Sequence, residues 1–296
     1  MIRPAAFGFN VQTADNNAFQ NKNAIQDNVQ QNALVEFDNF VAKLRAVDID
    51  VIVIEDSLKP HTPDAIFPNN WVSFHGDGSV YVYPMQAPNR RLERRTDIIT
   101  QLQNRFIVNQ INDLSNFENQ NQYLEGTGSM VLDRTNKLAY ACLSGRTHPQ
   151  VLEIFCAESG YQAITFNAVD DQNLPIYHTN VLMCVADKFV IICLDTIISE
   201  SEKNKLLQSF KNTHKEIIPI SLGQMKDFAG NMLEIKNKRG ENYLILSQTA
   251  FKSLSNKQID KISTYAKFLY TDLHTIEDNG GGSARCMLAE VCLPLK

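Results

Sequence analysis

The feature that most constrains this chain is a β-hairpin pattern that returns at nearly constant intervals. Each copy has an apolar run, a turn and a second apolar run. The copies begin near residues 70, 128, 180, 231 and 283, so their spacings are 58, 52, 51 and 52 residues. A fixed period in this range indicates a repeat architecture, in which units too small to fold alone stack on one another.

A helical pattern and a short β-rich run separate successive hairpins. An amphipathic helix over 33–46 precedes a buried strand over 51–54. Further helices are expected near 92–103, 149–159, 199–212 and 255–268. Strands are expected after them at 105–108, 161–166, 215–220 and 269–273. The helix starts have local support from Pro149 and from the capping-box pairs Ser199–Glu202 and Ser255–Gln258.

Five such units account for most of the 296 residues. The fifth unit ends early, with room for one strand after Cys286. Residues 3–9 form an extended segment, which we expect to pair with the last unit and close a ring, because closure removes exposed strand edges. The prediction is a single α/β domain over 1–296, built as a five-bladed α/β propeller. The alternative is an open mixed sheet whose regular spacing is accidental.

Composition narrows the class of protein. Hydrophobic residues make up 44% and charged residues 21%, which is typical of a globular chain. A net charge of −5 gives no electrostatic footprint for nucleic acid, and no apolar run approaches the ~20 residues that cross a membrane. The N-terminus lacks a signal-peptide pattern, so we expect a cytoplasmic protein with reduced cysteines. Homo-oligomerisation stays open, and the Asn/Gln-rich residues 10–32 are expected to form an ordered surface loop, helix or lid.

Polar residues stand where each hairpin begins, and a ring would bring these positions together at its axis. Glu125, His178 and Cys286 occupy such positions in three different units. A thiolate, a proton-transferring imidazole and an orienting carboxylate are the components of a nucleophilic cysteine site. The sequence therefore predicts a catalytic triad at the axis. Other polar residues at hairpin starts are Asp64, Asn69, Asn70, Asp227 and Asn231.

Each of these residues also has a purely structural interpretation. A lone cysteine is more often a small buried apolar side chain, and His178 could be a hydrogen-bonded core residue. Cys286 differs from the other cysteines because three glycines, 280–282, precede it and allow close backbone approach to a ligand. The cysteines that lie within apolar runs are Cys142, Cys156, Cys184, Cys193 and Cys292. No C-x-x-C or H-E-x-x-H motif occurs, so we expect neither a metal nor a cofactor.

These motifs resemble the guanidino-group-modifying superfamily, which has the pentein fold and includes arginine deiminases, dimethylarginine dimethylaminohydrolases and glycine amidinotransferases. The resemblance covers most of the chain and is closest overall to the citrulline-utilisation hydrolase branch. That branch has RPxxFGFN and PNNWVSFH segments like residues 3–10 and 68–75. By resemblance, GGGSARC contains the nucleophile Cys286, His178 matches the catalytic histidine, and Glu125 matches the carboxylate of an EGGD-like motif. Here that motif reads EGTG, so its Asp is absent.

The resemblance also implies substrate contacts. Asp64 matches an acidic residue near the substrate's α-amino group, and Arg90 and Arg146 match arginines that bind its α-carboxylate. Bidentate pairing with a carboxylate is a property of the guanidinium group. The alternative for Arg90 is a solvated face, since it lies in a basic cluster with Arg91, Arg94 and Arg95.

Two departures from the family pattern bear on the substrate. Many arginine-using members have a carboxylate at the positions of Asn70 and Asn180. Because a carboxamide both donates and accepts hydrogen bonds, it suits a neutral ureido group such as that of citrulline. The sequence predicts a cysteine hydrolase of a ureido or guanidino C–N bond, with a small amino acid as substrate. The alternatives are an arginine deiminase, an amidinotransferase or a non-catalytic binding protein with the same fold.

Overall fold

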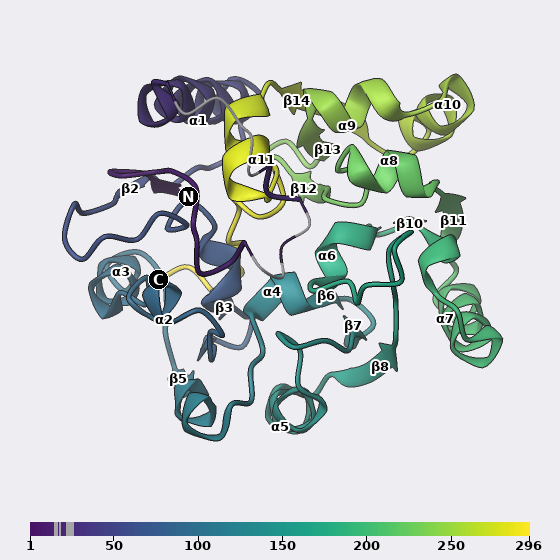
Figure 1. The fold of residues 1–296 in the computed structure, drawn as a ribbon, viewed down its shortest axis with the longest axis horizontal. Helices are drawn as coiled ribbons and strands as arrows, with labels where there is room; N and C mark the ends of the chain where they lie inside the picture. The colour runs from purple at the N-terminus through teal and green to yellow at the C-terminus, as the bar shows by residue number, and fades with distance from the viewer. Residues whose placement is uncertain (15–16, 18, 22–26) are drawn as a thin grey trace.

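The computed structural model describes residues 1–14, 17, 19–21 and 27–296. The chain forms a ring of small sheets around one axis, and its colour runs once around that ring from purple to yellow (Figure 1). The ring contains four three-stranded sheets and one two-stranded sheet in the described residues. This mixed α/β arrangement agrees with the predicted fold class and is consistent with five repeats.

The first four sheets share one topology, in which an antiparallel hairpin is followed by a parallel third strand. The first sheet contains β3 (Val72–Phe74), β4 (Ser79–Val82) and β5 (Gln110–Asp113). The second contains β6 (Met130–Asp133), β7 (Leu138–Cys142) and β8 (Gln162–Phe166). The third contains β9 (Met183–Val185), β10 (Phe189–Ile192) and β11 (Glu216–Pro219). The fourth contains β12 (Leu233–Lys236), β13 (Asn242–Ser247) and β14 (Lys267–Thr271).

The longer helices lie on the rim of the ring (Figure 1). The longer helices are α1 (Val29–Ala46), α3 (Thr96–Leu102), α5 (Pro149–Ser159), α7 (Glu200–Asn212) and α10 (Asn256–Ser263), and shorter ones are α2 (Pro88–Arg91), α8 (Leu222–Lys226) and α9 (Gln248–Ser253). Pro149 occupies the first turn of α5, as predicted. Ser255 and Gln258 form the expected capping box, whereas Ser199 accepts a hydrogen bond from the Glu202 backbone.

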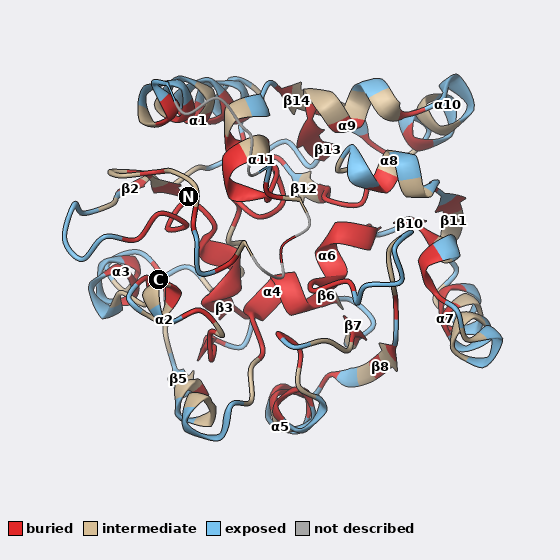
Figure 2. Cartoon of the chain, viewed as in Figure 1, coloured by how far each residue is buried: buried red, intermediate tan, exposed pale blue. Residues whose placement is uncertain are grey.

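Short helical turns face the axis and are buried, as the red segments at the centre of Figure 2 show. They are η1 (Pro68–Asn70), α4 (Gly126–Ser129) and α6 (Thr179–Leu182), and α11 (His274–Gly280) leads to the last hairpin position. Each turn opens one repeat, and α4 contacts both η1 and α6. Most of the polar residues named at the repeat starts are therefore buried near the axis, as the spacing predicted, whereas Asp227 lies at the end of α8 and is exposed.

The fifth unit differs from the prediction. β1 (Ile2–Arg3) pairs in parallel with β2 (Ile54–Glu55), and no strand follows Cys286. The C-terminal segment instead bonds to the first blade, where the Ile107 N–H donates to the Pro294 carbonyl at 2.8 Å. Ile2, Ile54 and Leu293 nonetheless share one apolar cluster, so the two chain ends meet through side-chain packing.

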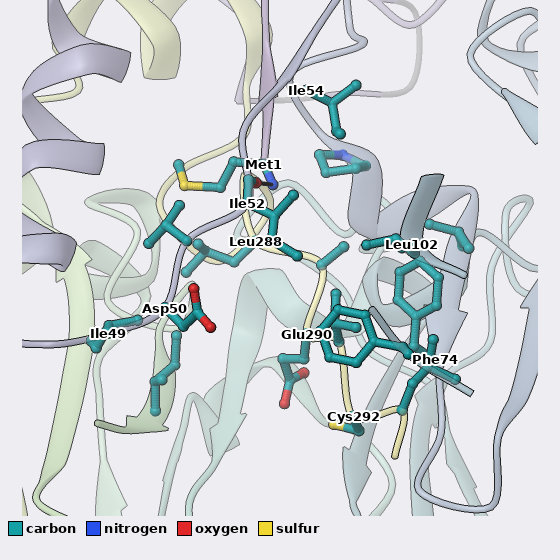
Figure 3. A pocket seen from close by; sticks show the side chains of 18 of the residues that line it. Met1, Ile49, Asp50, Ile52, Ile54, Phe74, Leu102, Leu288, Glu290 and Cys292 are labelled. Atoms are coloured by element: carbon teal, nitrogen blue, oxygen red, sulfur yellow. Dashed lines mark hydrogen bonds between the residues drawn. The ribbon is translucent and has the colours of Figure 1, made fainter. Parts of the chain in front are cut away.

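A largely apolar cavity of about 520 Å³ marks this irregular part of the ring. Figure 3 shows Met1, Ile52 and Leu288 around it, with Asp50 and Glu290 among its polar members. The cavity lies between the N-terminal strand pair and the C-terminal segment, where the expected last strand is missing.

Several predicted boundaries also move. The strand expected at 105–108 lies at 110–113, since residues 105–107 bond to the C-terminal segment. The strand expected over 51–54 is confined to 54–55. The helix expected over 255–268 ends at Ser263, because Phe268, Leu269 and Tyr270 pair with β13 instead. The helix expected over 92–103 is confined to α3 at 96–102, while α2 at 88–91 lies before the predicted start, and the helix expected from 33 begins at Val29.

Of residues 10–32, the described part contains a turn at 11–14 and the start of α1; residues 15–16, 18 and 22–26 lie outside the described residues. The described helices include none with the length and apolar character needed to cross a lipid bilayer.

Candidate active site

The three predicted triad residues lie at the inner ends of three repeats. Glu125 immediately precedes α4, His178 immediately precedes α6, and Cys286 lies in the turn after α11. All three are buried, with exposed fractions of 0, 3 and 6%. Oε2 of Glu125 lies 2.8 Å from Nε2 of His178, and Sγ of Cys286 lies 3.3 Å from Nδ2 of Asn180.

The Glu125–His178 pair has a defined charge state. Burial raises the pKa of Glu125, but Arg146 and the hydrogen bond from His178 outweigh it, so the pKa lies well below its ordinary value. Burial lowers the pKa of His178 to about 4, against the opposing influence of Glu125. The imidazole is therefore neutral at pH 7. Because a carboxylate only accepts, Nε2 carries the proton and Nδ1 is left able to accept one.

The backbone around Glu125 is built to hold this pair. The Gln86 N–H donates to Oε1 of Glu125 at 2.9 Å, while the Glu125 N–H donates to Oγ of Ser129 at 2.8 Å. A side chain at Gly128 would collide with the Asn70 amide and come within 2.8 Å of the His178 ring. Glycine at 128 thus permits the close approach of these two side chains.

Two amide side chains surround the sulfur of Cys286. Besides Asn180, Asn231 donates from Nδ2 to Sγ at 3.2 Å. Asn180 and Asn231 are 1% and 2% exposed. Oδ1 of Asn180 is buried and has no hydrogen-bond partner in the structure. The sulfur therefore accepts from two neutral donors, and no carboxylate in the described part of the chain forms a hydrogen bond with it.

A charged cluster lies on the other side of the site. Arg90 donates to both oxygens of Glu93 at 2.9 Å and to Oδ1 of Asn70 at 2.9 Å, and its Nε lies 3.7 Å from Asp64. Arg90 is 3% exposed, so the solvated-face interpretation of this residue is wrong. Burial raises the pKa of Glu93 to about 7 and raises that of Asp64, although Arg90 opposes both shifts.

The neighbouring arginines have separate partners outside this cluster. Arg91 and Arg94 pair with Glu118, and Arg95 pairs with Asp97. Arg90 alone of the basic run therefore reaches the buried site among these four.

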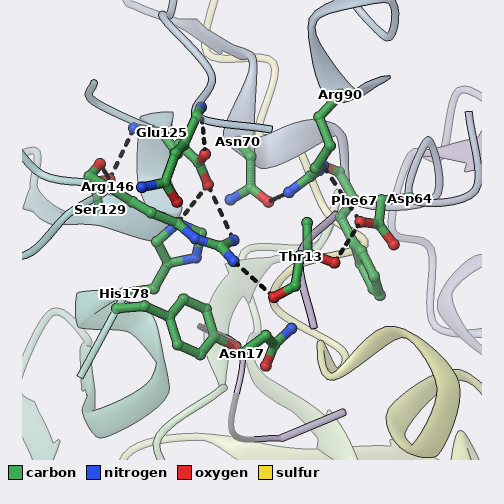
Figure 4. A network of polar contacts seen from close by, with 12 residues as sticks. Thr13, Asn17, Asp64, Phe67, Asn70, Arg90, Glu125, Ser129, Arg146 and His178 are labelled. Atoms are coloured by element: carbon green, nitrogen blue, oxygen red, sulfur yellow. Dashed lines mark hydrogen bonds and ion pairs between the residues drawn. The ribbon is translucent and has the colours of Figure 1, made fainter. Parts of the chain in front are cut away.

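The N-terminal segment contacts the charged cluster, and Figure 4 shows Thr13 beside Asp64 and Arg146. Asn10 donates to Oδ2 of Asp64 at 2.7 Å, and Thr13 lies between Asp64 and Arg146. The guanidinium of Arg146 lies 4.8 Å from the Tyr177 ring and 3.4 Å from Glu125. Both arginines assigned by resemblance are thus buried next to the triad.

Asn69 and Asn70 differ in what they contact. The Asn69 carbonyl accepts a hydrogen bond from Thr127 at 3.3 Å, while both polar atoms of its side chain are buried without a partner. Nδ2 of Asn70 is also buried and unpartnered. Together with Oδ1 of Asp64 and of Asn180, these atoms form a set of unsatisfied groups that a polar ligand could pair.

Sequence reasoning named Asn231 only as a polar residue at a repeat start and assigned Glu93 no role. The signal for Asn231 was present, because it lies 51 residues after Asn180 at the equivalent repeat position. A signal for Glu93 was also present, because it lies three residues after Arg90, a spacing at which opposite charges can pair.

The remaining cysteines behave as apolar packing groups. Burial raises the pKa of Cys142 and Cys184 to about 12 and that of Cys156 and Cys193 to about 11, and it also raises that of Cys292. Within the described part of the chain, no three His, Cys, Asp or Glu side chains are arranged to hold a metal ion.

Solved structures share this fold at low sequence identity. Apo ArgZ, an arginine dihydrolase from the ornithine–ammonia cycle in cyanobacteria, superimposes with a TM-score of 0.79 at 15% identity; the match covers 100% of this chain and 40% of ArgZ. This chain therefore spans well under half of that relative. The substrate-bound N-terminal domain of ArgZ gives a TM-score of 0.76 at 16% identity, with 99% and 98% covered.

A dimethylarginine dimethylaminohydrolase adduct with S-methyl-L-thiocitrulline gives a TM-score of 0.61 at 14% identity, covering 97% of this chain and 96% of that one. No curated protein sequence matches significantly. The family model described as "N,N dimethylarginine dimethylhydrolase, eukaryotic" matches residues 3–293. The chain therefore belongs to this family of hydrolases, within the guanidino-group-modifying superfamily that has the pentein fold.

Proposed function

We propose that this protein is a cysteine hydrolase that cleaves citrulline to ornithine, carbon dioxide and ammonia. One observation carries the proposal: the buried His178 of the Glu125–His178 pair precedes α6, whose Asn180 donates to the sulfur of Cys286 together with Asn231, and no described carboxylate forms a hydrogen bond with that sulfur. A neutral ureido group fits such surroundings, whereas a guanidinium cation favours an anionic partner.

The chemistry needs only these side chains and water. Nδ1 of His178 takes the Cys286 proton, and the thiolate attacks the ureido carbon. The C–Nδ bond breaks as His178 returns the proton to Nδ, so ornithine leaves and an S-carbamoyl enzyme remains. His178 then deprotonates a water that attacks the carbonyl carbon. The C–S bond breaks, the thiol is regenerated, and the released carbamic acid decomposes to carbon dioxide and ammonia.

The amino-acid end of the substrate is assigned to the charged side of the site. The unpartnered Oδ1 of Asp64 suits an α-ammonium group, and Arg146 and Arg90 suit the α-carboxylate. Asn69, Asn70 and Asn180 offer unpaired amide atoms to the ureido oxygen and nitrogens.

Arginine hydrolysis is the second candidate. It is favoured by the fold similarity to ArgZ, which is described as an arginine dihydrolase. In that reaction a terminal guanidino nitrogen leaves first, and the same triad serves both reactions.

A product screen tests the proposal. Purified protein is incubated with arginine, citrulline, agmatine and methylarginines, and ammonia, ornithine and citrulline are quantified separately. We expect ornithine from citrulline and no product with Cys286→Ser. Turnover of arginine with citrulline left untouched would overturn the substrate assignment in favour of the second candidate. Binding without any turnover would indicate a non-catalytic protein.

A further inference from the structure

Among the described residues, Asn231 is the side chain hydrogen-bonded to the Cys286 sulfur to which neither the predicted triad nor the predicted substrate contacts assign a role. It precedes β12 in the fourth blade and is 2% exposed. Its Nδ2 lies 3.2 Å from Sγ of Cys286 and 3.1 Å from the Asn180 carbonyl oxygen. Its Oδ1 accepts a hydrogen bond from the Arg285 N–H at 3.1 Å.

These contacts determine which way the Asn231 amide points. Oδ1 must face the Arg285 N–H, because an N–H group can only donate. Nδ2 must face the Asn180 carbonyl, because a carbonyl can only accept. A flip of the amide would oppose two donors on one edge and two acceptors on the other. The second N–H of Nδ2 is therefore directed at the sulfur in the resting protein.

Asn180 contacts the same sulfur but is held less completely. Its Nδ2 lies 3.3 Å from Sγ, while its Oδ1 has no partner. Asn180 can thus reorient toward a substrate, whereas rotation of Asn231 would break two backbone hydrogen bonds. Asn180 and Asn231 occupy equivalent repeat positions, but only Asn180 can turn toward a substrate without losing backbone hydrogen bonds of its amide.

Because the Asn231 amide cannot flip, its N–H group always points at the sulfur and affects the ionisation of the Cys286 thiol. A thiolate accepts such a hydrogen bond strongly, while a neutral thiol accepts it weakly, so the contact favours the nucleophilic form. The other ionisable groups around this part of the axis are Tyr177, His178, Glu125 and Arg285. The Arg285 guanidinium is turned toward the Leu288 carbonyl and Glu290, at 2.8 and 3.2 Å.

We propose that Asn231 is a thiolate-stabilising residue, whose side-chain amide is held by two backbone groups so that one N–H always donates to Sγ of Cys286. The same amide ties the fourth blade to the third through Asn180 and to the nucleophile turn through Arg285. This inference rests on the proposed function, in which Cys286 is the nucleophile.

The test measures the reactivity of Cys286 rather than turnover alone. Iodoacetamide alkylation of the Cys286 peptide is followed by mass spectrometry from pH 5 to 10 in the wild type, Asn231→Ala and Asn231→Asp. We expect the midpoint of the pH–rate profile to rise by about one unit in Asn231→Ala, with an approximately tenfold slower reaction at pH 7. Asn231→Asp, which keeps the shape but replaces the donor by an acceptor, should shift the midpoint further.

The matched control is Asn237→Ala. Asn237 is also a buried asparagine with backbone partners, Val47 and Glu241, but it lies in the turn after β12. This variant should lower the melting temperature without moving the alkylation profile. In the Asn231 variants, kcat should fall about tenfold while KM changes less than twofold.

The outcomes separate this inference from the proposed function. An unchanged alkylation midpoint in Asn231→Asp, with Cys286→Ser inactive, overturns the role of Asn231 and leaves the nucleophile in place. Full activity of Cys286→Ser overturns the proposed function itself. If Asn231→Ala does not fold, the near-isosteric Asn231→Asp still decides the question.

Discussion

The two sides of the buried site are built from different chemistry. On the first-blade side, Arg90 is held between Glu93 and Asp64, and the buried charges compensate one another. On the side of the third and fourth blades, Asn180 and Asn231 place neutral donors on the Cys286 sulfur. In the function proposed above, the charged side would hold the amino-acid end of the substrate, and the neutral donors would surround the reacting sulfur.

Glu125 and His178 connect to both sides: Figure 4 shows them across Asn70 from Arg90 and Asp64, and α6 leads from His178 to Asn180. Glu125 is the anion that contacts both an arginine and the imidazole, at 3.4 and 2.8 Å. The negative charge of Glu125 therefore acts on the histidine rather than directly on the sulfur.

The largest effect is expected where the two sides meet. Glu125→Gln removes the anion that orients His178 and accepts from Nε2, so we expect kcat to fall about 100-fold or more. Steady-state kinetics on the substrate identified by the product screen measures this change. The matched control is Glu118→Gln, which also removes an arginine-paired carboxylate but one outside the site. Comparable losses of activity in both variants would contradict the special position of Glu125.

A smaller effect is expected behind the nucleophile turn. Oε1 of Glu277 accepts from Oγ of Ser283 at 2.6 Å, and burial raises the pKa of Glu277 to about 7 despite the hydrogen bonds that lower it. Below pH 4.5, the ordinary pKa of a glutamate, the Glu277 carboxyl is protonated in both the folded and the unfolded protein. The stability that the protonated carboxyl contributes is then fully present. As pH rises toward 7 only the unfolded state ionises, so that contribution is lost.

Glu277→Gln cannot ionise and should escape this loss. We expect the free energy of unfolding of the variant, relative to wild type, to rise by about 2 kcal/mol between pH 5 and pH 8. Urea denaturation at four pH values across this interval measures the difference. If this difference in unfolding free energy did not change with pH, Glu277 would be ionised in the folded protein. The sulfur side would then contain a buried anion in addition to Glu125.

The smallest effect is expected from adding a negative charge next to Arg90. Asn70→Asp keeps the acceptor for Arg90 but places a carboxylate oxygen where the unpartnered Nδ2 lies. We expect kcat/KM for citrulline to fall about tenfold, and the ratio of arginine to citrulline turnover to rise. Competition assays with both substrates in one reaction give that ratio directly. An unchanged ratio would show that the amides do not select the neutral ureido group.

Much of the architecture was readable before the structure, and the reason is local. Repeat spacing, helix periodicity and capping residues are properties of short stretches of chain, so α5, α7 and the four hairpins lie close to where the sequence placed them. The same spacing brought Glu125, His178 and Cys286 to one axis. Besides several helix limits, the errors concern the last blade and β5, whose position depends on contacts with the distant C-terminal segment.

The sequence by itself determined which polar residues gather at the centre of the ring, because a regular period delivers equivalent positions to a common axis. Only the tertiary structure decided what those residues do to one another. Arg90 lies in a buried ion cluster because the fold brings the distant Asp64 to 3.7 Å from its Nε, and Asn231 has one orientation because backbone groups of two other segments border its amide. Such contacts join residues far apart in the chain, and no local pattern along the sequence contains them.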